Sequence, residues 1–95
     1  MNKKEKNDQV KMYDFTKCQE EVSIGMFVES DLSKTLANYI YQHTTDLESA
    51  EFARELFHKG KVEMNDKTRD IMIRNIGDSA LLISQKQAIL EILKR

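Results

Sequence analysis

The chain has two histidines, so any imidazole chemistry depends on His43 or His58. His43 falls on the apolar side of a predicted helix, one turn after Tyr39, where a ring commonly packs and hydrogen-bonds a nearby carbonyl or hydroxyl group. His58 follows Glu55 by three residues, the spacing with which helical bundles aim two ligands at a di-iron centre. Such centres need a second pair and further carboxylates, and Glu51 does not complete the set. The sequence therefore predicts no metal site and no cofactor.

Nucleophilic and phosphate-binding chemistry has equally little support. The single cysteine, Cys18, has Lys17 beside it but no histidine near it in the sequence. The glycines Gly25, Gly60 and Gly77 are too far apart to form a phosphate-binding loop. We therefore expect no catalytic residue and a non-enzymatic protein.

Length and charge narrow the class of protein. The 95 residues carry 15 Lys and Arg against 16 Asp and Glu, a formal net charge of -1, which argues against a general nucleic-acid binder. One domain fits this length, and we place it at residues 11–95 behind a flexible, slightly basic arm at residues 1–10. The charged amino terminus, the lack of a long apolar run and the lone cysteine predict a cytoplasmic protein that does not enter a membrane.

A β-hairpin is expected at residues 11–29. Val22, Ile24, Met26 and Val28 alternate with other side chains, and this period of two is typical of a strand. The short apolar patch before them supplies the other strand. Because an isolated two-stranded ribbon is marginal in water, the hairpin must lie on the helices or pair with another chain.

Cap residues and glycines divide the rest of the chain into four predicted helices. The Thr45-x-x-Glu48 pattern predicts a capping box, Gly60 is typical of a helix end, and Asn65 is a plausible cap. The expected helices run from Ser30 or Asp31 to His43, from Thr45 to Lys59, from Asp66 to Ile76 and from Ala80 to Lys94, with a short extended segment at residues 61–64. The fold class is therefore α+β, with an N-terminal β-hairpin packed against about four short helices. The predicted core consists of Val22, Ile24, Leu32, Leu36, Ile40, Phe52, Leu56, Phe57, Val62, Met72, Ile76, Leu82, Ile89 and Leu93.

Excess apolar surface in the last helix gives the main hypothesis for function. Ile83 and Leu90 lie on roughly the opposite side of that helix from its broad apolar stripe. Either the hairpin covers them or another molecule does. Phe27 and Tyr41 also lie outside the main apolar stripe of their elements, so each could likewise be covered by the chain itself or by a partner. We therefore predict an interaction module with Phe27, Tyr41, Ile83 and Leu90 at its interface, binding a second copy, as a homodimer, or an unidentified protein.

A small DNA-binding regulator is the alternative. It would use Lys67, Arg69 and Arg74 on the third helix, together with the basic arm. The long connection before that helix and the net negative charge of the chain argue against DNA binding.

The chain is also of the kind common among short reading frames of bacterial phages and other mobile elements.

Overall fold

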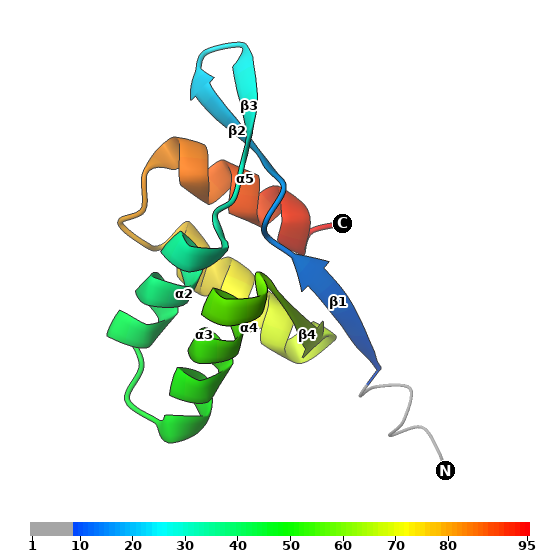
Figure 1. Cartoon of the computed structure of the whole chain (residues 1–95), viewed down its shortest axis with the longest axis vertical. Helices are drawn as coiled ribbons and strands as arrows, with labels where there is room; N and C mark the ends of the chain where they lie inside the picture. The colour runs from blue at the N-terminus through cyan, green and yellow to red at the C-terminus, as the bar shows by residue number, and fades with distance from the viewer. Residues whose placement is uncertain (1–8) are drawn as a thin grey trace.

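The computed structural model describes residues 9–95, in which a strand-rich half precedes a helical half (Figure 1). Residues 1–8, and with them most of the expected basic arm, lie outside this described part. The elements are β1 (Val10–Asp14), β2 (Cys18–Ser23), β3 (Met26–Ser30), α2 (Ser33–Gln42), α3 (Leu47–Lys59), β4 (Lys61–Asn65), α4 (Asp66–Gly77) and α5 (Ile83–Leu93). The predicted α+β class, with a hairpin and four helices in residues 9–95, is confirmed. None of those helices is long and apolar enough to cross a bilayer.

The strands form two separate antiparallel pairs. β1 pairs with β4, from Val10 opposite Asn65 to Asp14 opposite Lys61. β2 pairs with β3 through a turn that contains Gly25, whose φ is 82°, and the register shifts by one residue near the turn. The predicted hairpin is therefore present, but with a different first strand and turn. The segment before Cys18, predicted to be that first strand, pairs instead with a strand about fifty residues later. No local pattern indicates so distant a partner.

Three of the four helices in residues 9–95 begin next to a side chain that accepts a hydrogen bond from the first turn. Asp31 accepts hydrogen bonds from the amide and hydroxyl of Ser33, at 2.9 and 2.6 Å, as α2 begins. Asn65 accepts from the amide of Thr68 at 2.8 Å and caps α4, as predicted.

The capping box predicted at Thr45 is wrong. Asp46 caps α3 instead, because its carboxylate accepts from the amide of Ser49 at 2.8 Å. Gly60 ends α3 with a φ of 77°, as expected of a left-handed residue after a helix. The last helix begins at Ile83, three residues later than predicted.

The core lies where α2, α3, α5 and the β1–β4 pair meet. Its largest fully buried side chains are those of Phe15, Leu36, Leu56, Ile76, Ile89, Leu93, Val62 and Cys18. Five other predicted core residues hold fully or in part: Leu32 is also buried, and Ile40, Phe52, Phe57 and Met72 are partly buried against this cluster. Val22, Ile24 and Leu82 were predicted to be core residues and are exposed. They are exposed because the hairpin and the start of α5 extend away from the body of a molecule 49 Å long and 27 Å wide.

Candidate interaction surface

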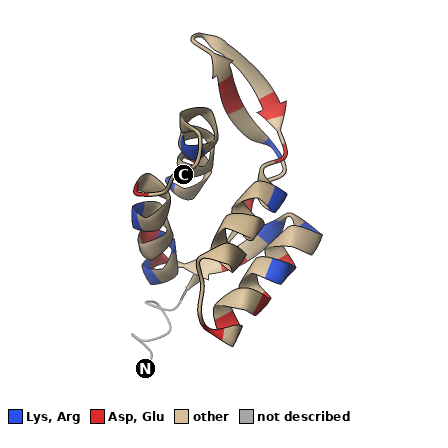
Figure 2. Ribbon diagram, turned by 90° about the vertical axis from the view of Figure 1, so that its left-hand side faces the viewer, with Lys and Arg blue, Asp and Glu red and all other residues tan. Residues whose placement is uncertain are grey.

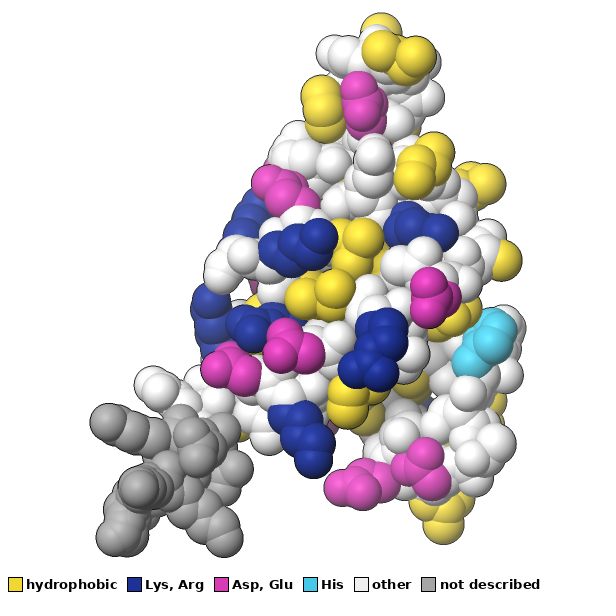
Figure 3. Space-filling view, turned by 180° about the vertical axis from the view of Figure 1, so that it is seen from behind, with side chains coloured by type: hydrophobic (Ala, Val, Ile, Leu, Met, Phe, Trp, Pro, Cys, Tyr) yellow, Lys and Arg dark blue, Asp and Glu magenta, His cyan; other side chains and the backbone are white. Residues whose placement is uncertain are grey.

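The tip of the β2–β3 hairpin carries a group of exposed apolar side chains. Ile24 at the turn is 100% exposed, and Phe27 in β3 is 57% exposed. Val22, Met26 and Val28 are exposed as well, so both faces of the ribbon carry apolar groups. In the space-filling view, hydrophobic side chains cover the projecting end of the molecule (Figure 3).

The start of α5 extends this surface. The hydroxyl of Ser84 donates a hydrogen bond of 2.8 Å to the carboxylate of Glu20 in β2, which holds the first turn of α5 against the hairpin. Leu82 and Ile83, just before Ser84, are 66% and 65% exposed. We call Val22, Ile24, Met26, Phe27, Val28, Leu82 and Ile83 together the hairpin surface.

The interface residues predicted from the sequence separate into three environments. Phe27 lines a shallow hollow with Gln87 of α5, and Ile83 lies one turn before Gln87 on the same helix. Leu90 is half-buried and packs against the core. Tyr41 is exposed on α2, where Arg54 lies over its ring, 5.3 Å from the centroid. Val22 and Ile24 were missed because alternation does not reveal which face of a strand the body covers.

The hairpin is also acidic. Between Lys17 and Lys34 the sequence contains Glu20, Glu21 and Glu29 together with an aspartate, and no Lys or Arg. In Figure 2 both of its strands carry positions of acidic residues. Glu21 also stabilises the turn, because its carboxylate accepts from the Gly25 amide at 2.7 Å.

Cys18 is a structural residue. It begins β2, is fully buried, and its thiol donates to the carbonyl of Phe15 at 3.3 Å. Burial raises the pKa of the thiol to about 11. The thiol therefore stays protonated at neutral pH and is a poor nucleophile.

The residues considered for a metal site form ion pairs instead. Glu51 accepts from Arg54 at 2.9 Å, and Glu55 lies 3.6 Å from the ammonium of Lys59. His58 is exposed, with its ring edge-on to Phe57. In the part of the chain that the structure describes, no three metal-binding side chains come together.

His43 is exposed, rather than packed on the apolar side of its helix as expected, and its Nδ1 lies 2.8 Å from the carbonyl oxygen of Tyr39.

The basic residues of α4 do not belong to a helix-turn-helix. Strand β4 separates α3 from α4 and pairs with β1, whereas a helix-turn-helix joins its helices by a short turn. Arg69 is held by Asp66 and Asp70, at 3.5 and 3.0 Å, and its side chain is only 25% exposed. Arg69 is therefore engaged within α4 rather than available beside Lys67 and Arg74 for the predicted contact with DNA.

Comparison with known proteins identifies no relative. The sequence matches no protein-family model and no curated protein, and no solved structure matches the fold. The functional inferences below therefore depend on the surface of this molecule alone.

Proposed function

We propose that the protein is a non-enzymatic interaction module that self-associates through the hairpin surface. The observation that carries this proposal is the exposure of aliphatic and aromatic side chains on a projecting two-stranded ribbon, together with that of Leu82 and Ile83 at the start of α5, which is bonded to the ribbon. Contiguous apolar groups on a soluble domain are typical of sites that bind another protein. A two-stranded ribbon is also marginal without further packing, so a partner that covers it stabilises it.

The outer edge of β3 offers a way to bind a second copy. β2 is the only strand hydrogen-bonded to β3 in residues 9–95, so the other edge of β3 has backbone groups available for a further strand. Of the two hairpin strands, β2 is the one against which α5 mainly packs, and β2 lies on the other side of the ribbon from this outer edge of β3. Two copies of β3 that pair antiparallel would form a four-stranded sheet by β-strand addition.

The residues of β3 suit such a pairing. In a two-fold register centred on Val28, that residue lies opposite the partner's Val28, and Phe27 lies opposite the partner's Glu29. Apolar cross-strand pairs stabilise a sheet, whereas like charges directly opposite each other destabilise it. This register brings no two carboxylates of β3 face to face, because Glu29 is the only charged residue in the strand.

Light scattering across a concentration series tests the proposal. The wild-type protein is expected to form a dimer, and Phe27→Glu combined with Ile83→Glu is expected to give a monomer with unchanged circular dichroism, because a glutamate at position 27 would lie opposite the partner's Glu29. Leu47→Glu is the matched control, because Leu47 is 84% exposed on α3 but lies outside the hairpin surface. The Leu47→Glu variant should dimerise as the wild type does.

Salt provides a second readout. The acidic hairpins of two copies repel each other, and added salt screens this repulsion. The dimer should therefore tighten as the salt concentration rises. A wild-type protein that stays monomeric at every concentration and salt level would exclude self-association.

A further inference from the structure

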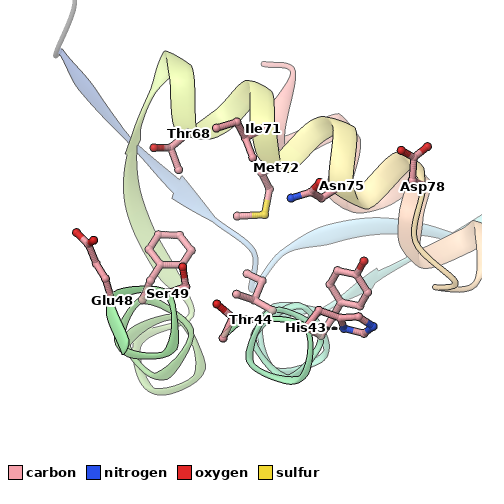
Figure 4. Close-up of a pocket in the computed structure, with 12 residues that line it drawn as sticks. His43, Thr44, Glu48, Ser49, Thr68, Ile71, Met72, Asn75 and Asp78 are labelled. Atoms are coloured by element: carbon pink, nitrogen blue, oxygen red, sulfur yellow. Dashed lines mark hydrogen bonds between the residues drawn. The ribbon is translucent and has the colours of Figure 1, made fainter. Parts of the chain in front are cut away.

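A second apolar surface lies on the other side of the molecule from the hairpin, between α4 and the α2–α3 pair. We call it the α4 cleft, and its volume is about 660 Å³ (Figure 4). This is within the roughly 300–1,000 Å³ of typical ligand sites. The cleft is lined by Tyr39, Ile40, His43, Thr44, Glu48, Ser49, Phe52, Thr68, Ile71, Met72, Asn75 and Asp78.

The floor of the cleft is apolar. Ile40, Phe52 and Met72 are partly buried against the core, so their remaining exposed surface faces outward. Ile71 is 43% exposed on α4. In Figure 4 the side chain of Met72 points from α4 across the gap toward α2 and α3. An apolar occupant would therefore contact three helices at once.

The rim of the cleft is acidic. Glu48 and Asp78 lie toward its two ends, and the lining residues include no Lys or Arg (Figure 4). Lys67 and Arg74 also belong to α4 but are not among the lining residues. The last turn of α2, at the floor, has no basic residue to balance the partial negative charge of a helix C-terminus. These charges favour an occupant with basic side chains at both ends.

The walls also determine the backbone conformation of the occupant. Except for His43 and Thr44, which follow α2, and Asp78, which follows α4, the lining residues belong to α-helices, whose backbone groups bond within the helix. The cleft therefore offers no strand edge to an extended peptide. A helical peptide satisfies its own backbone hydrogen bonds, which makes it the suitable form.

We propose that the α4 cleft binds an amphipathic, basic α-helix of a partner protein. The lining residues on this side run from Thr68 in α4 to Asp78 just after it, a span of about 15 Å, so an occupant of about three turns matches the cleft. Its apolar residues recur every three or four positions and its Lys or Arg residues lie at both ends. The hairpin of a second copy is a poor occupant, because it is acidic and extended.

Fluorescence anisotropy with two labelled peptides tests the proposal. Both peptides carry the same apolar stripe of three helical turns, one with Lys and the other with Glu at the flanking positions. The basic peptide is expected to bind and the acidic one to bind at least tenfold more weakly. Ile71→Gln should weaken the binding of the basic peptide about tenfold, because it removes apolar contact from the exposed wall of the cleft without adding charge.

Charge reversal at the rim gives the specific control. Glu48→Lys with Asp78→Lys should reverse the preference, so that the acidic peptide binds better. Glu63→Lys makes the same kind of change at an exposed position of β4, outside the cleft, and should leave the preference unchanged. Equal binding of the two peptides, no binding of either, or binding unaffected by Ile71→Gln would overturn the proposal. The hairpin variants should bind the basic peptide as the wild type does, which separates this site from self-association.

Discussion

Replacing Gly60 with alanine is expected to destabilise the fold more than any other glycine substitution in the chain. Gly60 lies at the junction of α3 and β4, is buried, and has a φ of 77°. Its carbonyl oxygen accepts from the amide of Phe15 at 3.0 Å, which ties the end of β1 to this junction. A Cβ atom at Gly60 would overlap the Cγ2 atom of Thr16.

The expected loss combines two effects. A left-handed conformation costs a residue with a side chain about 1–2 kcal/mol, of which about 0.4–1 kcal/mol is offset by the lower entropy of alanine in the unfolded chain. The overlap with Thr16 adds about 1–3 kcal/mol, as in other overpacked sites. Gly60→Ala should therefore lower the free energy of unfolding by about 2–3 kcal/mol and the Tm by about 10–20 °C.

Urea denaturation followed by circular dichroism measures these changes, and the other two glycines are the controls. Gly25 has a φ of 82° and open space around it, so Gly25→Ala should cost about 1 kcal/mol or less. Gly77 has neither a positive φ nor a close neighbour and ends α4, so Gly77→Ala should be neutral or stabilising by up to about 1 kcal/mol.

A second substitution separates overlap from backbone strain. Thr16→Ser removes the methyl group that meets the new Cβ but keeps the hydroxyl that donates to Asp14 at 2.6 Å. Added to Gly60→Ala, it should restore about 1 kcal/mol or more of the lost stability. If Gly60→Ala costs no more than Gly25→Ala, or if Thr16→Ser restores nothing, the packing assigned to this junction is wrong.

Two further predictions concern titratable groups. Native Cys18 should resist alkylation at pH 8 and react fully in urea, because burial raises its pKa to about 11; rapid labelling of the folded protein, followed by mass spectrometry, would contradict this. The Ser49 amide donates a hydrogen bond to the Asp46 carboxylate and so holds the pKa of that carboxyl below its ordinary value of 3.8. The stability that this cap adds to the folded protein is therefore complete above pH 3.8 and is lost as the pH falls through the lowered pKa. Asp46→Asn should keep the cap and flatten this acid dependence in thermal melts, whereas Thr45→Ala should change neither property.

Local signals in the sequence determined most of the helical half. Gly60 and Asn65 mark the end of α3 and the start of α4, because a left-handed glycine and a capping side chain act on backbone within three or four residues of themselves. The apolar positions of the helices were also predictable, since the period of 3.6 fixes which side chains share a face. Neighbouring residues can still compete for one role, which is why Asp46 rather than Thr45 caps α3.

Only the tertiary structure decided how the strands pair and which apolar residues stay exposed. Pairing of β1 with β4 joins segments about fifty residues apart, and the alternation of Val22 and Ile24 would be the same on a covered or an open face. The α4 cleft likewise has no signal in the sequence, because its lining residues become neighbours only once α4 is placed beside α2 and α3. A side chain's type and period depend on its own segment, whereas its exposure depends on what the rest of the chain brings against it.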